Sequence, residues 1–599
     1  MLQNCLDIFE KEYRKHGERL ISDNYVLKEG TYKIILINDK FRITDTLDVK
    51  RPKRGDNEIS DNANSELIAD IKFYDYNSKY LNSNKALISG EGKIIQSASY
   101  MAFAIKKNSL ADMEKLRRVT EKYYDTLKNP LLKYKKGKTA DIYKEFEEDA
   151  GKPDSELIDR IREYILSGKA WEDVDKEKKD YLKLFFVLPG KEETEKVYKR
   201  EHERYLIPNL YNNNEYNVTV GDEVFGLPDN NMGMNSKKPF LANKTRKIAT
   251  PYLLNREKAK LQNRFFDYLY GGAAKGEQNV YLRDDGKEPS IVFLPDNKEP
   301  AAVSGGYYLR LSIGNSGAEI IKSGAVPNYS PIMEKKFILR DFVSHEGEKK
   351  EPDKRYGQIR ERIWEIKVMI DDIFFNGMLK NNFFTDAKDI KCDNVMKGCI
   401  LESRDALHNW FYLGERKNAV IVLRKVSWEL IKCALSENNI FEARRRGDLR
   451  WSLIDYFNDN ERMWESMSDV REKLRQHINS KEEWMFYDGK ELSYAIGQAV
   501  SYLLSKSKAS SKPASTINPF LSTKDIGYMK TLIRRMYVKY NYSIGASANS
   551  RENQLFSHIA RAESEDFVVD KDFIFAGFAD KNLVYELGTG KEEGGKDDE

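Results

Sequence analysis

Cysteine and histidine are scarce in this chain of 599 residues, which has four of the first and six of the second. The cysteines form no CxxC pair and no pair of histidines lies near them, so the usual spacing of a zinc site is missing. We expect free thiols in a reducing cytoplasm, which excludes a fold held by disulfides. We expect neither a metal nor a cofactor.

Long apolar runs are also missing. No run reaches the roughly 18 residues of a membrane-spanning helix, and the acidic residues near the N-terminus interrupt any apolar core of a signal peptide. The sequence therefore predicts a cytoplasmic protein with no membrane partner. Residues 1–20 instead predict an amphipathic helix.

Catalytic motifs are equally scarce. The chain contains no HExxH and no GxSxG sequence, and we predict that it is not an enzyme. One alternative stays open, because Asp353, Glu365 and Lys367 follow the acid–acid–lysine order of metal-dependent nucleases. That chemistry requires carboxylates that converge on a metal. The isoleucines at helical spacing between residues 359 and 373 predict one helix there, which favours a structural role.

The chain has almost no net charge, because its 100 basic and 96 acidic residues give a formal net charge of only +4. The total charge therefore gives no argument for a nucleic-acid partner, and the distribution of charge along the chain must decide. The chain is also too long for a single ordinary core, so about two to four domains are expected.

The most unusual stretch runs from Gly226 to Lys247, with the sequence GLPDNNMGMNSKKPFLANKTRK. Its proline, glycine and asparagine residues favour turns. Residues 226–264 contain nine Lys or Arg against two acids. Amides can pair with base edges while Lys and Arg contact phosphates, so the stretch predicts a nucleic-acid contact. The alternative is a surface turn followed by a solvated basic helix.

Two kinds of pattern predict an α+β fold, in which short sheets and helices of the N-terminal and central region precede a C-terminal helical bundle. Short β-rich segments predict a hairpin over residues 32–44 and strands over 280–282, 291–294 and 306–311. Helical spacing dominates residues 108–205 and 355–478. The basic clusters 416–417, 424–425 and 444–446 are either exposed helix faces or a nucleic-acid track.

The composition divides the chain into five parts. They are an N-terminal α+β region (1–205), a strand-rich region with the basic loop (206–350), a mainly helical region (351–484), a helical bundle (485–588) and a disordered tail (589–599). Apolar stripes that begin at Leu492, Ile526 and Leu555, with a fourth helix over 573–583, predict the bundle. Residues 490–561 contain eleven Lys or Arg against three acids, so the bundle is basic.

Three segments carry a resemblance to a known family. They are IPNLY at 207–211, the stretch 226–247, and the C-terminal pattern GQAVSYLLSKSKASS…NPFL…KYNYSI…FAGF. Together they resemble the large subunit of the type I-B CRISPR Cascade complex, an RNA-guided antiviral assembly. The resemblance implies a non-catalytic protein that recognises the protospacer-adjacent motif in duplex DNA, helps to open the duplex, stabilises the R-loop and helps to recruit the helicase–nuclease.

The resemblance also implies partners and residue roles. The partners are CRISPR RNA, target double-stranded DNA with its displaced single strand, the helicase–nuclease, and the backbone, handle-capping and small subunits of the complex. The C-terminal bundle is similar to the separate small subunits of related complexes and is expected to line the path of the displaced strand. The motif-reading role is expected for Asn230, Asn231, Gly233, Asn235, Lys237 and Lys238. Phosphate binding is expected for Lys244, Arg246 and Lys247. Binding of the displaced strand is expected for Lys530, Arg534, Arg535 and Lys539.

Met485 is a candidate internal start of translation. The residues before it, Lys-Glu-Glu-Trp, can be encoded with a purine run similar to a bacterial ribosome-binding site. A product that begins at Met485 would contain the bundle alone, as a separate small subunit would. Met463 and Met467 are alternative starts, and the further alternative is that Met485 is an ordinary residue at a helix end.

Overall fold

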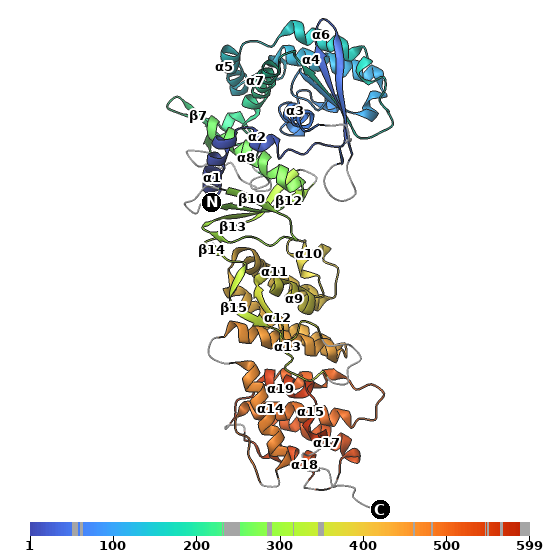
Figure 1. Cartoon of the computed structure of the whole chain (residues 1–599), viewed down its shortest axis with the longest axis vertical. Helices are drawn as coiled ribbons and strands as arrows, with labels where there is room; N and C mark the ends of the chain where they lie inside the picture. Colours follow the sequence, from blue (N-terminus) through green and yellow to red (C-terminus); the bar gives the residue numbers. More distant parts are fainter. Residues whose placement is uncertain are drawn as a thin grey trace, which may run out of the picture. The chain divides into compact units, whose positions relative to one another are not determined.

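We describe the protein from a computed structural model (Figure 1). The described residues are 1–50, 58–59, 64–230, 232, 252–283, 290–314, 317–345, 353–458, 462–480, 483–545, 547, 550–563 and 567–586. The chain forms two compact units. Unit 1 consists of Met1–Lys298 with Val303–Pro327, and unit 2 of Glu299–Ala302 with Asn328–Glu599.

Both units combine the elements that the predicted α+β class requires, and that class is confirmed. The helices of unit 1 are α1 (Leu2–His16), α2 (Arg19–Ser22), α3 (Ser65–Tyr76), α4 (Met113–Lys128), α5 (Lys138–Ala150), α6 (Ser155–Leu166), α7 (Lys191–Asn209) and α8 (Arg256–Ala274). Its strands are β1 (Gly30–Ile37), β2 (Phe41–Lys50), β3 (Glu58–Ile59), β4 (Ala102–Lys106), β5 (Tyr181–Val187), β6 (Val218–Val220), β7 (Glu223–Gly226), β8 (Leu254–Asn255), β9 (Asn279–Arg283), β10 (Ser290–Leu294), β11 (Val303–Ser304), β12 (Gly306–Gly314) and β13 (Gly317–Ala325).

Unit 2 is mainly helical. Its strands are β14 (Asn328–Tyr329), β15 (Ile332–Ile338) and β16 (Ile359–Arg362). Its helices are α9 (Ile363–Phe375), α10 (Leu379–Asn382), α11 (Asn394–His408), α12 (Arg416–Ser436), α13 (Ile440–Phe457), α14 (Met463–Asn479), α15 (Gly489–Ser505), α16 (Asn518–Leu521), α17 (Ile526–Tyr540), α18 (Arg551–Arg561) and α19 (Lys571–Ala579).

The first sheet of unit 1 has the order β3-β2-β1-β5-β4. The predicted hairpin over residues 32–44 is confirmed, since β1 and β2 pair in antiparallel fashion around Ile37 and Phe41. The other edge of β1 pairs with β5 in parallel. Residues 108–205 are therefore not helical throughout, because β5 supplies a buried central strand between the helices α6 and α7.

The second sheet of unit 1 has the order β10-β9-β12-β13 and confirms the strands predicted after residue 280. The amphipathic helix predicted at the N-terminus is α1, which buries Phe9 against Phe265 of α8, with 5.1 Å between the ring centroids. The same cluster includes Leu282 of β9 and Leu309 of β12. Helix α8 is thereby fixed on a sheet, and its N-terminal half is available to hold the basic loop.

The helix predicted over residues 359–373 begins later than the isoleucine spacing indicates. Residues 359–362 form β16, which pairs with β15, and α9 starts at Ile363. The side chain of Glu365 accepts hydrogen bonds from the backbone N–H groups of Glu361 and Arg362, so it caps the helix at the change from strand to helix.

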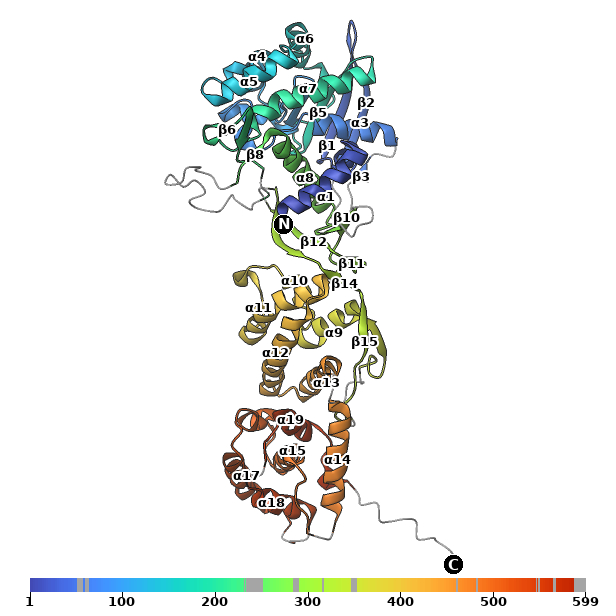
Figure 2. The ribbon, with the colours of Figure 1, turned by 90° about the vertical axis from the view of Figure 1, so that its left-hand side faces the viewer.

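The C-terminal bundle has α15 as its central helix, in contact with α14, α17, α18 and α19 (Figure 2). The predicted stripe of α15 is confirmed, since Leu492, Ile496 and Leu503 are fully buried. Where α15 and α19 meet, a Cβ on Gly497 would press on the carbonyl of Ile574. Glycine is therefore required for the close approach of the two backbones. The fourth predicted helix is shorter than expected, because α19 ends at Ala579.

The bundle shares its core with the helices before it. Trp451 of α13 packs on Phe575 of α19, with 5.6 Å between centroids, and donates from Nε1 to a carboxylate oxygen of Asp572 at 2.7 Å. Arg450 binds the same carboxylate with two hydrogen bonds. The ranges 351–484 and 485–588 thus lie within one compact unit, and residue 485 is not at a break in the core.

Candidate nucleic-acid interface

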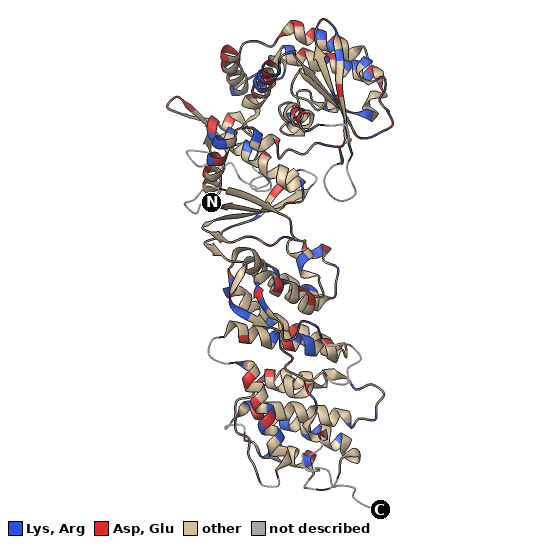
Figure 3. Cartoon of the chain, viewed as in Figure 1, with Lys and Arg blue, Asp and Glu red and all other residues tan. Residues whose placement is uncertain are grey.

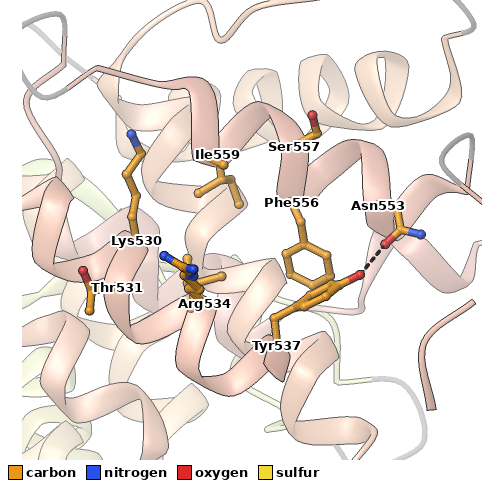
Figure 4. Close-up of a pocket in the computed structure, with 10 residues that line it drawn as sticks. Lys530, Thr531, Arg534, Tyr537, Asn553, Phe556, Ser557 and Ile559 are labelled. Atoms are coloured by element: carbon orange, nitrogen blue, oxygen red, sulfur yellow. Dashed lines mark hydrogen bonds between the residues drawn. The ribbon is translucent and has the colours of Figure 1, made fainter. Parts of the chain in front are cut away.

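A pocket of about 640 Å³ lies between α17 and α18 (Figure 4). Two of the four cations that the sequence assigned to a displaced strand, Lys530 and Arg534, line it. The remaining lining residues are Thr531, Ile533, Tyr537, Asn553, Phe556, Ser557, Ile559 and Ala560. This volume is within the usual range of small-molecule sites, about 300–1,000 Å³.

The sequence of α17 places these two cations together. The carboxylate of Asp525 caps the helix by accepting from the backbone N–H of Tyr528 at 3.0 Å. Met529 and Ile533 are buried on the bundle side, and residues one turn apart share a helix face. Lys530 and Arg534 consequently stand side by side next to the buried stripe.

The other two assigned cations are separate from this pair. Arg535 and Lys539 are exposed and are not among the residues that line the pocket. They lie one turn apart from each other and more than a quarter-turn of the helix away from Lys530 and Arg534. The structure therefore brings together two of the four residues and leaves the other two on a different face of α17.

An aromatic pair forms part of the pocket wall. The hydroxyl of Tyr537 donates to Oδ1 of Asn553 at 3.0 Å, and Nδ2 of Asn553 donates to the carbonyls of Gly545 and Ser547 at 2.8 Å each. The ring of Phe556 meets that of Tyr537 edge-to-face, with centroids 5.1 Å apart and planes at 79°. Tyr537 is thereby held in one orientation before any ligand arrives.

The electrostatics of the pocket favour an anion. Helix α17 contains four basic residues and no acid. Among the residues that the structure describes, neither the side chain of Lys530 nor that of Arg534 forms an ion pair or hydrogen bond. Figure 3 shows that acidic and basic residues are interspersed over both units, whereas α17 carries basic residues alone.

One of the basic clusters of unit 2 that were considered as a track, the run 444–446, has an internal role instead. Arg445 pairs with Asp353 and Asp372, and Arg446 is buried and donates to the carbonyl of Leu430. These arginines join α13 to its neighbours and are not an exposed helix face. The clusters 416–417 and 424–425 of α12 are exposed, as the helix-face alternative predicts, and Lys425 pairs with Glu402 of α11 at 2.5 Å.

The described ends of the basic loop are firmly held in unit 1. The loop begins after β7, and Gly226 lies against the ring of Tyr211, where a Cβ would collide. Nδ2 of Asn230 donates to Oδ1 of Asn263 at 3.4 Å, and its backbone carbonyl accepts from Nε2 of Gln262 at 2.9 Å. The side chain of Asn230 is thus engaged with α8, and a contact with a base edge would require it to leave that helix. The other residues assigned to this loop lie outside the described residues: Asn231, Gly233, Asn235, Lys237, Lys238, Lys244, Arg246 and Lys247.

The three residues of the nuclease alternative each have a different partner. Asp353 pairs with Arg355 and Arg445; burial acts to raise the pKa of Asp353, but the hydrogen bonds from Arg355 hold that pKa down at about 2. Glu365 caps α9, and Lys367 is buried and donates to the hydroxyl of Tyr412 at 2.7 Å. Across the described parts of the chain, no group of three or more His, Cys, Asp or Glu residues has the arrangement of a metal site.

Met485 lies in the connector between α14 and α15, and 83% of its surface is exposed. Its neighbours Trp484 and Phe486 are buried, and Trp484 is stacked between the rings of His477 and His558 at 4.7 and 3.8 Å. The connector is therefore fixed by the residues on either side of Met485, while Met485 itself has little structural role.

The residues that sequence reasoning missed are Tyr537, Asn553 and Phe556. Tyr537 follows Arg534 by three residues, so it was placed on the same side of α17 by helical spacing alone. Asn553 and Phe556 come from another helix, and only the packing of α17 on α18 brings them to the pocket.

Comparison of the chain with models of protein families gives no match, and comparisons with curated proteins and with solved structures give none either. No helix in the described part of the chain is both long enough and apolar enough to span a membrane.

Proposed function

We propose that this protein is a non-catalytic, nucleic-acid-binding subunit, and that its place is that of the large subunit of a type I-B Cascade complex. The observation that carries the proposal is the pair Lys530 and Arg534, which have no acidic partner among the described residues and stand beside an aromatic pocket. Cations beside aromatic side chains are the common means of binding single-stranded nucleic acid, because the cations contact phosphates and the rings stack with bases.

The remaining parts of the proposal rest on the resemblance of the three sequence segments. The loop after Asn230 would read the motif beside the target in duplex DNA, and the bundle would hold the displaced strand. CRISPR RNA and the other Cascade subunits would be the partners, in the cytoplasm, and the helicase–nuclease would be recruited after the R-loop forms. The attachment of both loop ends to α8 supports a reader that is held in place, since a reading element must keep its register on the duplex.

The rival proposal, a metal-dependent nuclease, has weaker support. Its acid–acid–lysine residues would have to give up an arginine pair, a helix cap and a buried hydrogen bond before they could approach one metal. Incubation of the purified protein with DNA and Mg²⁺ or Mn²⁺ separates the two proposals. Cleavage that Glu365→Ala abolishes would favour the nuclease, and the scaffold proposal expects no cleavage.

The experiment that tests the leading proposal is purification of the tagged chain from its native host with its neighbouring genes intact. We expect a small RNA and several partner subunits to co-elute with the chain. A chain that elutes alone, without RNA, after expression at native level would contradict the proposal.

A further inference from the structure

We propose that the pocket between α17 and α18 receives a single unstacked base of a nucleic-acid strand, whose adjoining phosphates contact Lys530 and Arg534. The inference rests on the proposed function and adds to it a defined ligand, a nucleotide held through its base. A strand held only by charge would slide over the bundle, whereas a strand with one base inserted would be anchored at one point.

The shape and chemistry of the pocket support this ligand. Its buried end is apolar, with Ile533 and Ile559 at 6% and 2% exposure. Its wall includes the rings of Tyr537 and Phe556, and its rim has the two cations (Figure 4). A nucleotide has a matching division into a flat aromatic base, whose faces stack on rings, and an anionic phosphate. The occupant that matches both parts is therefore a base with its phosphate, because an apolar peptide side chain would leave the cations unused.

The pocket is preorganised for stacking. Asn553 makes three of the four hydrogen bonds that its amide can form, with Tyr537, Gly545 and Ser547, and these bonds hold the amide in place. That amide fixes the hydroxyl of Tyr537, and Phe556 holds the ring from the side. Little side-chain freedom is lost when a base binds, which favours affinity. The hydroxyl of Ser557, which has no hydrogen-bond partner among the described residues, is left to contact a polar edge of the base.

The experiment compares two single strands of about 15 nucleotides, a length that spans the usual binding sites. One is oligothymidine, whose bases stack weakly on each other. The other has the same backbone without bases. Both are titrated into the full chain at one salt concentration. Wild type should bind oligothymidine roughly 5- to 150-fold more tightly than the abasic strand, the range expected for one stacked base.

Three variants of pocket residues and two matched controls complete the test. Tyr537→Ala should weaken binding of oligothymidine to the level of the abasic strand and leave the abasic strand unaffected, while Tyr537→Phe, which keeps the ring, should lose less. Arg534→Gln should weaken both strands. Tyr528→Ala and Lys524→Gln remove an exposed ring of the same helix and an exposed cation just before it, both outside the pocket, and should change neither strand. A melting curve for each variant confirms that the bundle is folded.

The outcomes are distinguishable. Equal binding of the two strands by wild type would refute the base pocket and leave the proposed function standing. No binding of either strand would refute both. If Tyr537→Ala leaves both strands unchanged but loses partner subunits on co-purification, the pocket belongs to a protein ligand and the inference is wrong.

Discussion

The hydroxyl of Tyr252 donates a hydrogen bond to Oε1 of Gln262, with 2.8 Å between the two oxygens. Nε2 of the same amide donates to the backbone carbonyl of Asn230 at 2.9 Å. Asn230 precedes and Tyr252 follows the segment 231–251, so one side chain of α8, only 1% exposed, joins both ends of the basic loop.

Replacement of Gln262 by Leu should destabilise unit 1. The change leaves two partly buried polar groups, the hydroxyl of Tyr252 and the carbonyl of Asn230, without this partner, and together they should cost about 1–3 kcal/mol. Urea unfolding, followed by a probe in unit 1, measures the change in the free energy of unfolding. Tyr252→Phe removes one of the two hydrogen bonds and should cost less. Equal stability of Gln262→Leu and wild type would show that the amide does not hold the loop.

Replacement of Asn231 and Asn235 by Ala should weaken binding to duplex DNA that bears the motif and spare binding to a target that is already open. Each lost contact with a base edge should cost about 1–3 kcal/mol. Titration of the assembled complex with the two substrates measures the difference. A similar loss on both substrates would show that these amides do not read the motif.

Reversal of charge at Lys530 and Arg534, with Glu at both positions, should flatten the dependence of R-loop stability on salt. Fewer phosphates would be neutralised, and each lost contact with a single strand lowers the slope of log K against log[salt] by about 0.7. Dissociation measured at several salt concentrations gives this slope. Lys524→Glu, which lies outside the pocket, serves as the charge control. An unaltered slope in the double variant would show that the bundle does not contact the displaced strand.

The buried His202 should make unit 1 sensitive to acid. Burial, with the charges of Lys79 and Arg264, lowers the pKa of His202 to about 3 in the folded protein, against about 6.5 for an unfolded chain. Below pH 6.5 the unfolded state binds the additional proton, so the stability is fully present above that pH and is lost as the pH falls toward 3.

His202→Phe removes this titration and keeps a ring beside Tyr76, whose centroid lies 5.8 Å from that of His202. Between pH 7.5 and pH 5 the variant should gain about 2 kcal/mol on wild type in the free energy of unfolding. Denaturation of both proteins at the two pH values checks the prediction. A difference between them that stays the same at both pH values would contradict it.

Internal initiation at Met485 should yield a second, short product when the gene carries a C-terminal tag. Silent recoding of codons 481–483 should remove the short band and leave the full-length protein. Met485→Leu should do the same, because the side chain is exposed and its replacement should be tolerated by the fold. A short band that survives both changes points to Met463 or Met467 as the start, and the absence of any short band would refute the idea.

Local patterns in the sequence predicted the elements well and their partners poorly. The stripe of α15 and the hairpin of β1 with β2 depend on neighbouring residues, and both were found. Strand β5 was missed because it lies between charged helical segments, and its pairing with β1 joins residues about 150 positions apart. Its run YLKLFFV is a typical buried strand and was the signal available.

The candidate site shows the same division. Helical spacing was sufficient to place Lys530 beside Arg534, yet it also grouped them with Arg535 and Lys539, which lie on another face. The run Arg444 to Arg446 misled for a related reason. Consecutive helix residues point in directions about 100° apart. Each of the three arginines therefore binds a different partner, and the three do not form one surface.

The shared core across residue 485 bears on what a separately translated bundle would be. In a separately translated bundle, acidic residues that now pair with arginines of α13 and α14 would have no ion-pair partner. The apolar side of α19 that Trp451 covers would be exposed to solvent. Such a chain would have low stability on its own. It would instead bind a surface that presents arginines around an aromatic ring. The pairs that would be parted are Arg450 with Asp572, Arg471 with Asp580 and Arg475 with Glu586.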